Sequence, residues 1–79
     1  MSRGFDRKVT FEIVKHIGVL REHSTGWKKE LNIVKWNNGQ PKYDIRDWDE
    51  EHTHMTRGVT LTAHEMSTII SLMKDIEEV

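Results

Sequence analysis

Polar and apolar residues alternate with a period of two along most of the chain, and the period changes to 3.6 after residue 61. Alternation predicts strands that bury one face, and the longer period predicts an amphipathic helix. The first alternating segment covers residues 8–21, which is longer than a typical strand. Its pattern breaks between Lys15 and Gly18, so we expect a kink or bulge there.

Two more strands are predicted on either side of a tight turn, one over about residues 27–36 and one over residues 42–48. Asn38-Gly39 between them is the kind of pair that supplies the positive φ angles of a hairpin. Pro41 cannot donate a hydrogen bond to a ladder, so it opens the third strand or lies at an edge. This region therefore predicts an antiparallel hairpin.

The last part of the chain predicts a loop at 49–56, a short strand at 58–61 and a helix. The helix begins with Thr62-Ala63-His64-Glu65, which matches a capping box. One apolar stripe follows at helical spacing, formed by Met66, Ile69, Ile70, Met73 and Ile76. Leu72 lies off that stripe and is a candidate contact with a second subunit. We therefore expect an α+β fold, a four-stranded antiparallel curved sheet followed by one C-terminal helix (β-β-β-β-α), in a dimer.

Strand parity divides the predicted sheet into two faces. The helix is expected to cover the face that carries Phe11, Ile13, Leu31, Ile33, Tyr43 and Ile45. The other face is left to water or to a partner and carries Lys28, Asn32, Trp36, Lys42, Arg46 and Trp48. Single-stranded nucleic acid requires this combination, because aromatic rings stack on bases and cations hold phosphates.

Two observations keep an alternative open for this face. Trp36 and Trp48 would also suit the end of a hairpin or the core of a dimer, with the lysines forming a solvated surface. Glu30 and Asp44 have the same parity and would repel phosphate, unless they pair with Lys28 or Arg46 and set the geometry of those side chains.

Length and composition narrow the class of protein. Seventy-nine residues form one domain with a thin core, which we divide into a flexible N-terminus at 1–8 and a folded domain at 9–79. No segment approaches the roughly 20 apolar residues of a membrane helix, so no membrane partner is expected. The absence of Cys excludes disulfides and thiolate sites and favours a cytoplasmic location. A thin core without such cross-links favours oligomerisation.

The net charge of −1 argues weakly against a nucleic-acid-binding protein, but the charge is unevenly distributed. Residues 1–46 carry ten Lys and Arg against five Asp and Glu, a net of +5, whereas residues 47–79 carry two against eight, a net of −6. Fields act locally, within a Debye length of about 8–10 Å. The positive part can therefore still attract an anion.

Nothing in the sequence predicts catalysis. There is no independently supported Ser/His/Asp set, no glycine-rich phosphate loop and no carboxylate pair on a regular element, so we expect neither an enzyme nor a cofactor. His52 and His54 lie beside Asp49, Glu50 and Glu51, a composition that could hold a metal ion. Neighbouring loop residues without a framework seldom do so, and a solvated loop is the expectation.

Three segments in order resemble a known family. They are residues 26–37, beginning Gly-Trp-Lys-Lys-Glu-Leu-Asn, then residues 41–48, Pro-Lys-Tyr-Asp-Ile-Arg-Asp-Trp, and then residues 55–62, Met-Thr-Arg-Gly-Val-Thr-Leu-Thr. This set resembles the small bacterial YdbC-like members of the positive-cofactor-four family of single-stranded-DNA-binding transcriptional coactivators, over about residues 9–77. The resemblance implies a β-β-β-β-α subunit that dimerises with help from its helix and forms grooves for single-stranded DNA.

The resemblance also indicates binding residues. Arg46 and Trp48 match the third-strand arginine and the aromatic residue after it, and Arg57 matches the basic residue before the glycine. With residues placed by parity and charge, the predicted nucleic-acid-binding set is Lys28, Lys29, Lys35, Trp36, Lys42, Arg46, Trp48 and Arg57. Lys29 and Lys35 have the parity of the helix-covered face, so they belong to this set only if the strand ends twist or bulge.

These observations predict a cytoplasmic homodimer, with nucleoid association as an alternative, that is not an enzyme and binds single-stranded DNA with little sequence preference. RNA is an alternative ligand. A role with the transcription machinery, or in replication or repair, follows from the resemblance alone. The alternative function is a protein-interaction module that docks a peptide on the Trp/Arg face or on a sheet edge.

Overall fold

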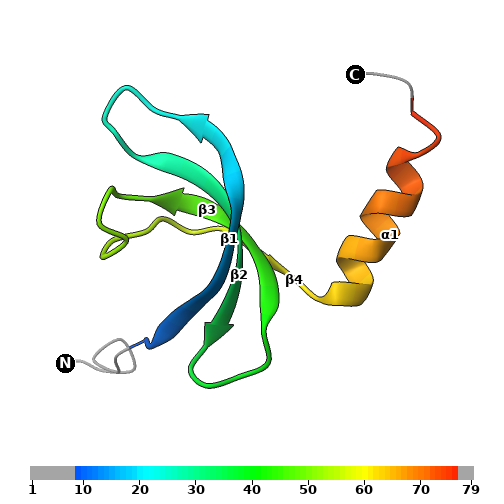
Figure 1. Cartoon of the computed structure of the whole chain (residues 1–79), viewed down its shortest axis with the longest axis horizontal. Helices are drawn as coiled ribbons and strands as arrows, with labels where there is room; N and C mark the ends of the chain where they lie inside the picture. The colour runs from blue at the N-terminus through cyan, green and yellow to red at the C-terminus, as the bar shows by residue number, and fades with distance from the viewer. Residues whose placement is uncertain (1–8, 77–79) are drawn as a thin grey trace.

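The computed structural model describes residues 9–76, and the predicted flexible segment 1–8 lies outside the described residues. The elements are β1 (Phe11–Glu22), β2 (Lys28–Trp36), β3 (Lys42–Trp48), β4 (Val59–Leu61) and α1 (Ala63–Met73). The strands form one sheet in the order β1-β2-β3-β4, and all neighbours are antiparallel. Figure 1 shows a strongly curved sheet, from which α1 projects beyond β4. The predicted β-β-β-β-α order is confirmed.

Bulges bend β1 along its length. The register against β2 shifts at three places, between Ile13 and Lys15, between His16 and Gly18, and between Val19 and Arg21. Each extra residue bends and twists the strand locally, which lets twelve residues follow the shorter β2. The bulge predicted between Lys15 and Gly18 is confirmed.

The β2–β3 turn uses its two asparagines. Asn37 and Asn38 have φ angles of 52° and 65°, and the backbone N–H of Gly39 donates to the carbonyl of Trp36 at 2.8 Å. The positive φ angles were predicted one residue later, at Asn38-Gly39, and that placement is wrong. Asparagine tolerates the left-handed region because its short polar side chain bonds locally, so the turn does not need glycine at either central position.

Gly58 and a capped helix end connect the sheet to α1. A Cβ atom at residue 58 would overlap the carbonyl oxygen of Ile45 and the Cβ of Arg46, so only glycine allows this close approach. The Thr62 hydroxyl accepts from the backbone N–H of Glu65 at 3.0 Å, and the Glu65 carboxylate accepts from the N–H of Thr62 at 2.8 Å. The predicted capping box is confirmed.

The buried residues lie on one face of β2 and β3, which we call the inner face. They are Glu30, Asn32, Val34, Asp44 and Trp48. The loop at 49–56 and the start of β1 close over part of this face, since Phe11 and His52 both pack on the Trp48 ring. We call the opposite face the outer face, and its apolar residues Leu31, Ile33, Tyr43 and Ile45 are half-buried.

The expectation that the helix covers the sheet is wrong. No residue of α1 is buried, and the helix contacts only β3 and β4. Phe11 and Ile13 also lie on the inner face, opposite Trp36 and Val34, rather than on the face that carries Leu31. All three bulges of β1 lie between Ile13 and the β1–β2 turn. Counted from that turn, each extra residue reverses the side to which the side chains beyond it point, so an odd number of bulges moves Phe11 and Ile13 to the other face.

Within residues 9–76, no helix is both long enough and apolar enough to cross a membrane.

Candidate nucleic-acid interface

The predicted parity of the Trp/Arg face is correct, although this face is covered rather than open. Lys28 lies opposite Trp48, Asn32 opposite Asp44, and Lys42 opposite Val34. Side chains at these positions therefore share the inner face with Trp36 and Arg46. Polar and basic residues reach solvent only toward the ends of the strands, where Lys42 is exposed and Lys28 is half-buried.

Trp48 lies in the centre of the covered region. Its relative exposure is 0%, and its ring centroid is 5.1 Å from that of Phe11 and 5.5 Å from that of His52. The expectation that Trp48 presents an exposed ring is wrong, because the curvature of the sheet brings the start of β1 over it. Trp48 therefore shapes the sheet, and a base has no access to its faces.

Arg46 is held by partners within the domain. Its Nε lies 2.6 Å from Oδ1 of Asp44 and a terminal nitrogen lies 2.8 Å from Oδ2, a bidentate ion pair. Its other terminal nitrogen donates to the carbonyl of Thr56 at 3.2 Å. The guanidinium carbon lies 4.6 Å from the centre of the Trp36 ring, which is cation–π distance. The anticipated pairing of Asp44 with Arg46 is confirmed, and it leaves Arg46 little charge to offer a phosphate.

A second polar network lies beside this ion pair on the inner face. The Glu30 carboxylate accepts from Nδ2 of Asn32 at 3.0 Å, and both of its oxygens lie 3.0 Å from Nε2 of His52. Nδ1 of His16 lies 2.7 Å from Oδ1 of Asn32. These contacts explain how Glu30 and Asn32 can be buried, since buried polar groups are stable when their hydrogen bonds are satisfied.

The two histidines of the loop at 49–56 contact different carboxylates. His52 reaches Glu30, whereas Nδ1 of His54 lies 3.0 Å from Oδ2 of Asp49. Hydrogen bonds from the backbone N–H of His54, and further ones from the side chains of His54 and Thr53, hold the pKa of Asp49 well below its usual range. Over residues 9–76, no group of three or more His, Cys, Asp or Glu is arranged to hold a metal ion.

The cations outside the Arg46 ion pair are more accessible. Lys42 and Arg57 are exposed, and Lys28, Lys29 and Lys35 are half-buried. Among the described side chains, none of these five lies within ion-pair distance of a carboxylate. Lys29 and Lys35 have outer-face parity as predicted, but α1 does not cover that face, so both reach solvent.

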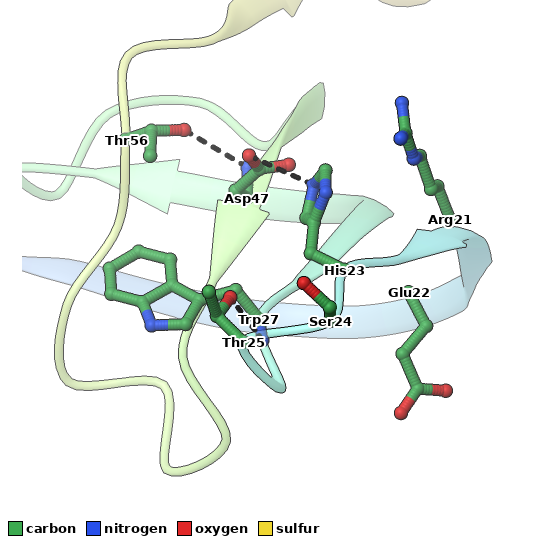
Figure 2. A pocket seen from close by; sticks show the side chains of 8 residues that line it. All are labelled: Arg21, Glu22, His23, Ser24, Thr25, Trp27, Asp47 and Thr56. Carbon is green, nitrogen blue, oxygen red and sulfur yellow. Dashed lines mark hydrogen bonds and ion pairs between the residues drawn. The ribbon is translucent and has the colours of Figure 1, made fainter.

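A cavity of about 640 Å³ opens at the β1–β2 turn, and we call it the hairpin cavity (Figure 2). Its lining comprises Arg21, Glu22, His23, Ser24, Thr25, Trp27, Asp47 and Thr56. Nε2 of His23 lies 3.2 Å from Oδ2 of Asp47, and the backbone N–H of Asp47 donates to the Thr56 hydroxyl at 3.2 Å. These contacts join the turn to the end of β3 and to the segment before β4.

The sequence-based reasoning missed this cavity. Trp27 lies in the first segment that resembles the family and was assigned no role there, and no role was predicted for His23. One signal was available, because a tryptophan directly after Gly26 places a large aromatic ring at the boundary between a turn and a strand. The 24-residue separation between His23 and Asp47 gave no local sign of their contact.

A four-stranded open sheet that leads through a close-packed glycine into a capped helix defines a class of small β-β-β-β-α domains. Residues 23–72 match the model of the family described as Transcriptional Coactivator p15 (PC4). The chain belongs to this family, which is known for binding single-stranded DNA, and the resemblance found in the sequence is confirmed.

A relative from Treponema pallidum (strain Nichols) is 35% identical to the chain over 66 residues. The aligned segment covers 84% of this chain and 78% of the relative, which bears the name "Uncharacterized protein". The likeness therefore extends over most of both chains, beyond the segment that matches the family model.

Proposed function

We propose that the protein binds single-stranded DNA with little sequence preference, as a cytoplasmic homodimer without enzymatic activity. The observation that carries the proposal is the match of residues 23–72 to a family known for this binding. The cations that have no carboxylate partner within residues 9–76 support it, since nucleic-acid affinity comes largely from Lys and Arg contacts with phosphates. A role with the transcription machinery belongs to the same proposal and rests on the family alone.

The structure changes the roles within the predicted residue set. Phosphates are bound by cations without a carboxylate partner among the described residues, which are Lys28, Lys29, Lys35, Lys42 and Arg57. Arg46 instead neutralises Asp44 and lies against the ring of Trp36, so it supports the surface from within. Trp36 is half-buried and remains an aromatic contact at the end of β2.

Binding to labelled oligo-dT is expected to weaken with salt, with a slope of log K against log salt of about −0.7 for each phosphate contact. Lys42→Gln removes an exposed cation of β3 and should make this slope less steep by about 0.7. Lys74→Gln removes the same charge at the exposed end of α1 and should leave the slope unchanged. Fluorescence anisotropy at several salt concentrations measures both.

Oligo-U and duplex DNA serve as comparison ligands in the same titration. Binding of oligo-U as tight as that of oligo-dT would extend the ligand class to RNA. Failure of every oligonucleotide to bind at low salt would reject the proposed function, and an affinity independent of salt would reject phosphate anchoring.

The exposed apolar side of α1 supports the dimer. Ile69, Ile70, Leu72 and Met73 are 40–64% exposed, and contiguous apolar surface of this kind commonly marks an interface. Ile70→Glu places a charge in this surface and is expected to convert the dimer to a monomer in sedimentation velocity. Ser71→Glu adds the same charge on the polar side of α1 and should not. A wild-type protein that sediments as a monomer at every concentration would contradict the homodimer.

A peptide-docking module remains the second candidate, because one sheet edge has the required character. β1 is an edge strand, and its exposed apolar residues are Val14, Ile17, Val19 and Leu20. Such an edge can pair with an extended peptide by adding a strand. Absence of oligonucleotide binding would favour this candidate.

A further inference from the structure

We propose that the hairpin cavity is a nucleotide subsite, in which one base of the bound strand stacks on Trp27 and the adjoining phosphate contacts Arg21. This inference rests on the proposed single-stranded DNA binding and identifies where a base enters the protein. It concerns residues outside the Trp/Arg face that the sequence indicated.

The three tryptophans differ in what their rings can offer a ligand. Trp48 is fully buried, and the Trp36 ring already has the Arg46 guanidinium 4.6 Å from its centre. Trp27 is half-buried and lines two separate hollows, the hairpin cavity and a smaller one of about 250 Å³. Figure 2 shows its indole at one side of the hairpin cavity, across from His23 and Arg21. Trp27 is therefore the tryptophan best placed to receive a base.

Charges around the cavity orient a nucleotide. Arg21 is exposed at one end, and its cross-strand neighbour is Lys29, so two cations lie together at that side. Asp47 is the other cross-strand neighbour of Lys29, so its carboxylate lies in the same row. Glu22 also lines the cavity, but its side chain points to the opposite side of the strand from Arg21 (Figure 2). The smaller hollow behind Trp27 is lined by Asp49, Glu50 and Glu51. These three carboxylates repel phosphate from the Trp27 side, which favours the phosphate at Arg21 and the base at the indole.

The size and chemistry of the cavity also fit one nucleotide. Its volume of about 640 Å³ is within the range of roughly 300–1,000 Å³ that small-ligand sites occupy. Hydroxyls of Ser24 and Thr25 line it and can donate to or accept from the edge of a base, whereas the Thr56 hydroxyl already accepts from the N–H of Asp47 and donates to the carbonyl of Arg57. Stacking itself is insensitive to sequence, because every base has a π face. The subsite is therefore compatible with binding of many sequences.

The contact between His23 and Asp47 gives the cavity a fixed wall. His23 lies at the turn after β1, and Asp47 belongs to β3. The backbone N–H of His23 also donates to the carbonyl of Trp27 at 2.8 Å. One contact therefore joins the turn to β3 and the other closes the turn itself, so the turn that carries the indole needs little ordering when a base binds.

The experiment compares binding of labelled oligo-dT to the wild type, Trp27→Ala and Trp27→Phe by anisotropy at low salt. Trp27→Ala should weaken binding between about 5-fold and 150-fold, the range for loss of one stacking contact. Trp27→Phe keeps a ring and should bind within a few-fold of the wild type. Stacking quenches indole emission, so the quenching by oligo-dT should be smaller in Trp27→Phe than in the wild type by the contribution of Trp27.

Two further measurements separate stacking from a loss of structure. Abasic sites in the strand should weaken binding to the wild type but have much less effect on Trp27→Ala. Arg21→Gln should make the salt slope less steep by about 0.7, the amount for one phosphate, whereas Lys15→Gln, at another exposed position of β1, should leave it unchanged.

The outcomes distinguish this inference from the proposed function. A wild-type protein that binds no oligonucleotide rejects both. The subsite is rejected, and single-stranded DNA binding is left intact, if the wild type binds, oligo-dT quenches Trp27→Phe as much as the wild type, and abasic sites weaken binding to Trp27→Ala and to the wild type equally.

Discussion

Trp48→Ala is expected to destabilise the whole domain rather than to remove one contact with DNA. The side chain is completely buried between Phe11 and His52, and truncation of a buried Trp to Ala costs about 3–5 kcal/mol. A domain of this length has a free energy of unfolding of roughly 4–12 kcal/mol in total. The variant should therefore lose at least about a quarter of its free energy of unfolding and unfold at a much lower urea concentration than the wild type. Urea denaturation followed by circular dichroism measures the loss.

Trp27→Ala is the matched control, because it removes the same side chain from a half-buried position. Its unfolding midpoint should stay much closer to that of the wild type. If Trp48→Ala had the urea midpoint of the wild type and yet failed to bind oligo-dT, the result would contradict a structural role for Trp48. It would indicate a direct contact between Trp48 and the ligand.

Arg46→Met is expected to have the second-largest effect, again on stability. The substitution leaves the Asp44 carboxylate, which is 0% exposed, without its bidentate partner. Breaking a buried ion pair by removing one partner costs about 3–5 kcal/mol, because the remaining charge is buried alone. The hydroxyl of Thr60 still donates to Asp44 at 3.0 Å and offsets part of this cost. Equilibrium unfolding in urea measures this loss in the free energy of unfolding.

A double variant tests this explanation. Asp44→Asn together with Arg46→Met removes both charges, so its stability should exceed that predicted by adding the two single losses, with a coupling of about 0.5–3 kcal/mol. Lys42→Met is the control for an exposed cation on the same strand and should change stability by no more than about 0.5 kcal/mol. Equal stability of Arg46→Met and Lys42→Met, with binding lost only in the former, would make Arg46 a phosphate ligand instead.

The order and limits of the elements could be predicted because the signals were local. Alternation placed the strands within one to three residues, and the Thr62–Glu65 capping box fixed the start of the helix. The turn between β2 and β3 was predicted one residue late, because glycine was preferred over asparagine for the left-handed positions.

The buried side of the sheet could not be predicted from polarity. The inner face buries Glu30, Asn32 and Asp44, which an alternating pattern assigns to solvent. These groups are stable there because partners distant in sequence satisfy them, such as His52 for Glu30, 22 residues away. Side-chain pairing of this kind follows from curvature and register, which a single sequence does not specify.

The candidate site was predicted in part for a related reason. Lys28, Lys42 and Arg57 reach solvent as expected, and Lys29 and Lys35 do so because α1 leaves the outer face uncovered. Arg46 and Trp48 were assigned to an open surface and instead support it from within. The same parity rule gave both results, since it identifies which side chains share a face but not whether that face is covered. The hairpin cavity depends on the His23–Asp47 contact across the sheet and had no local signature.

The separation of α1 from its own sheet has a consequence for how the chain acquires its structure. An isolated helix shorter than about 12–15 residues is only marginally stable in water, and α1 has eleven residues, none of them buried. The formation of α1 must then depend on the surface that packs against it. In the proposed homodimer, helix content would accordingly depend on assembly, and a dilute subunit would keep its sheet while its last segment unwinds.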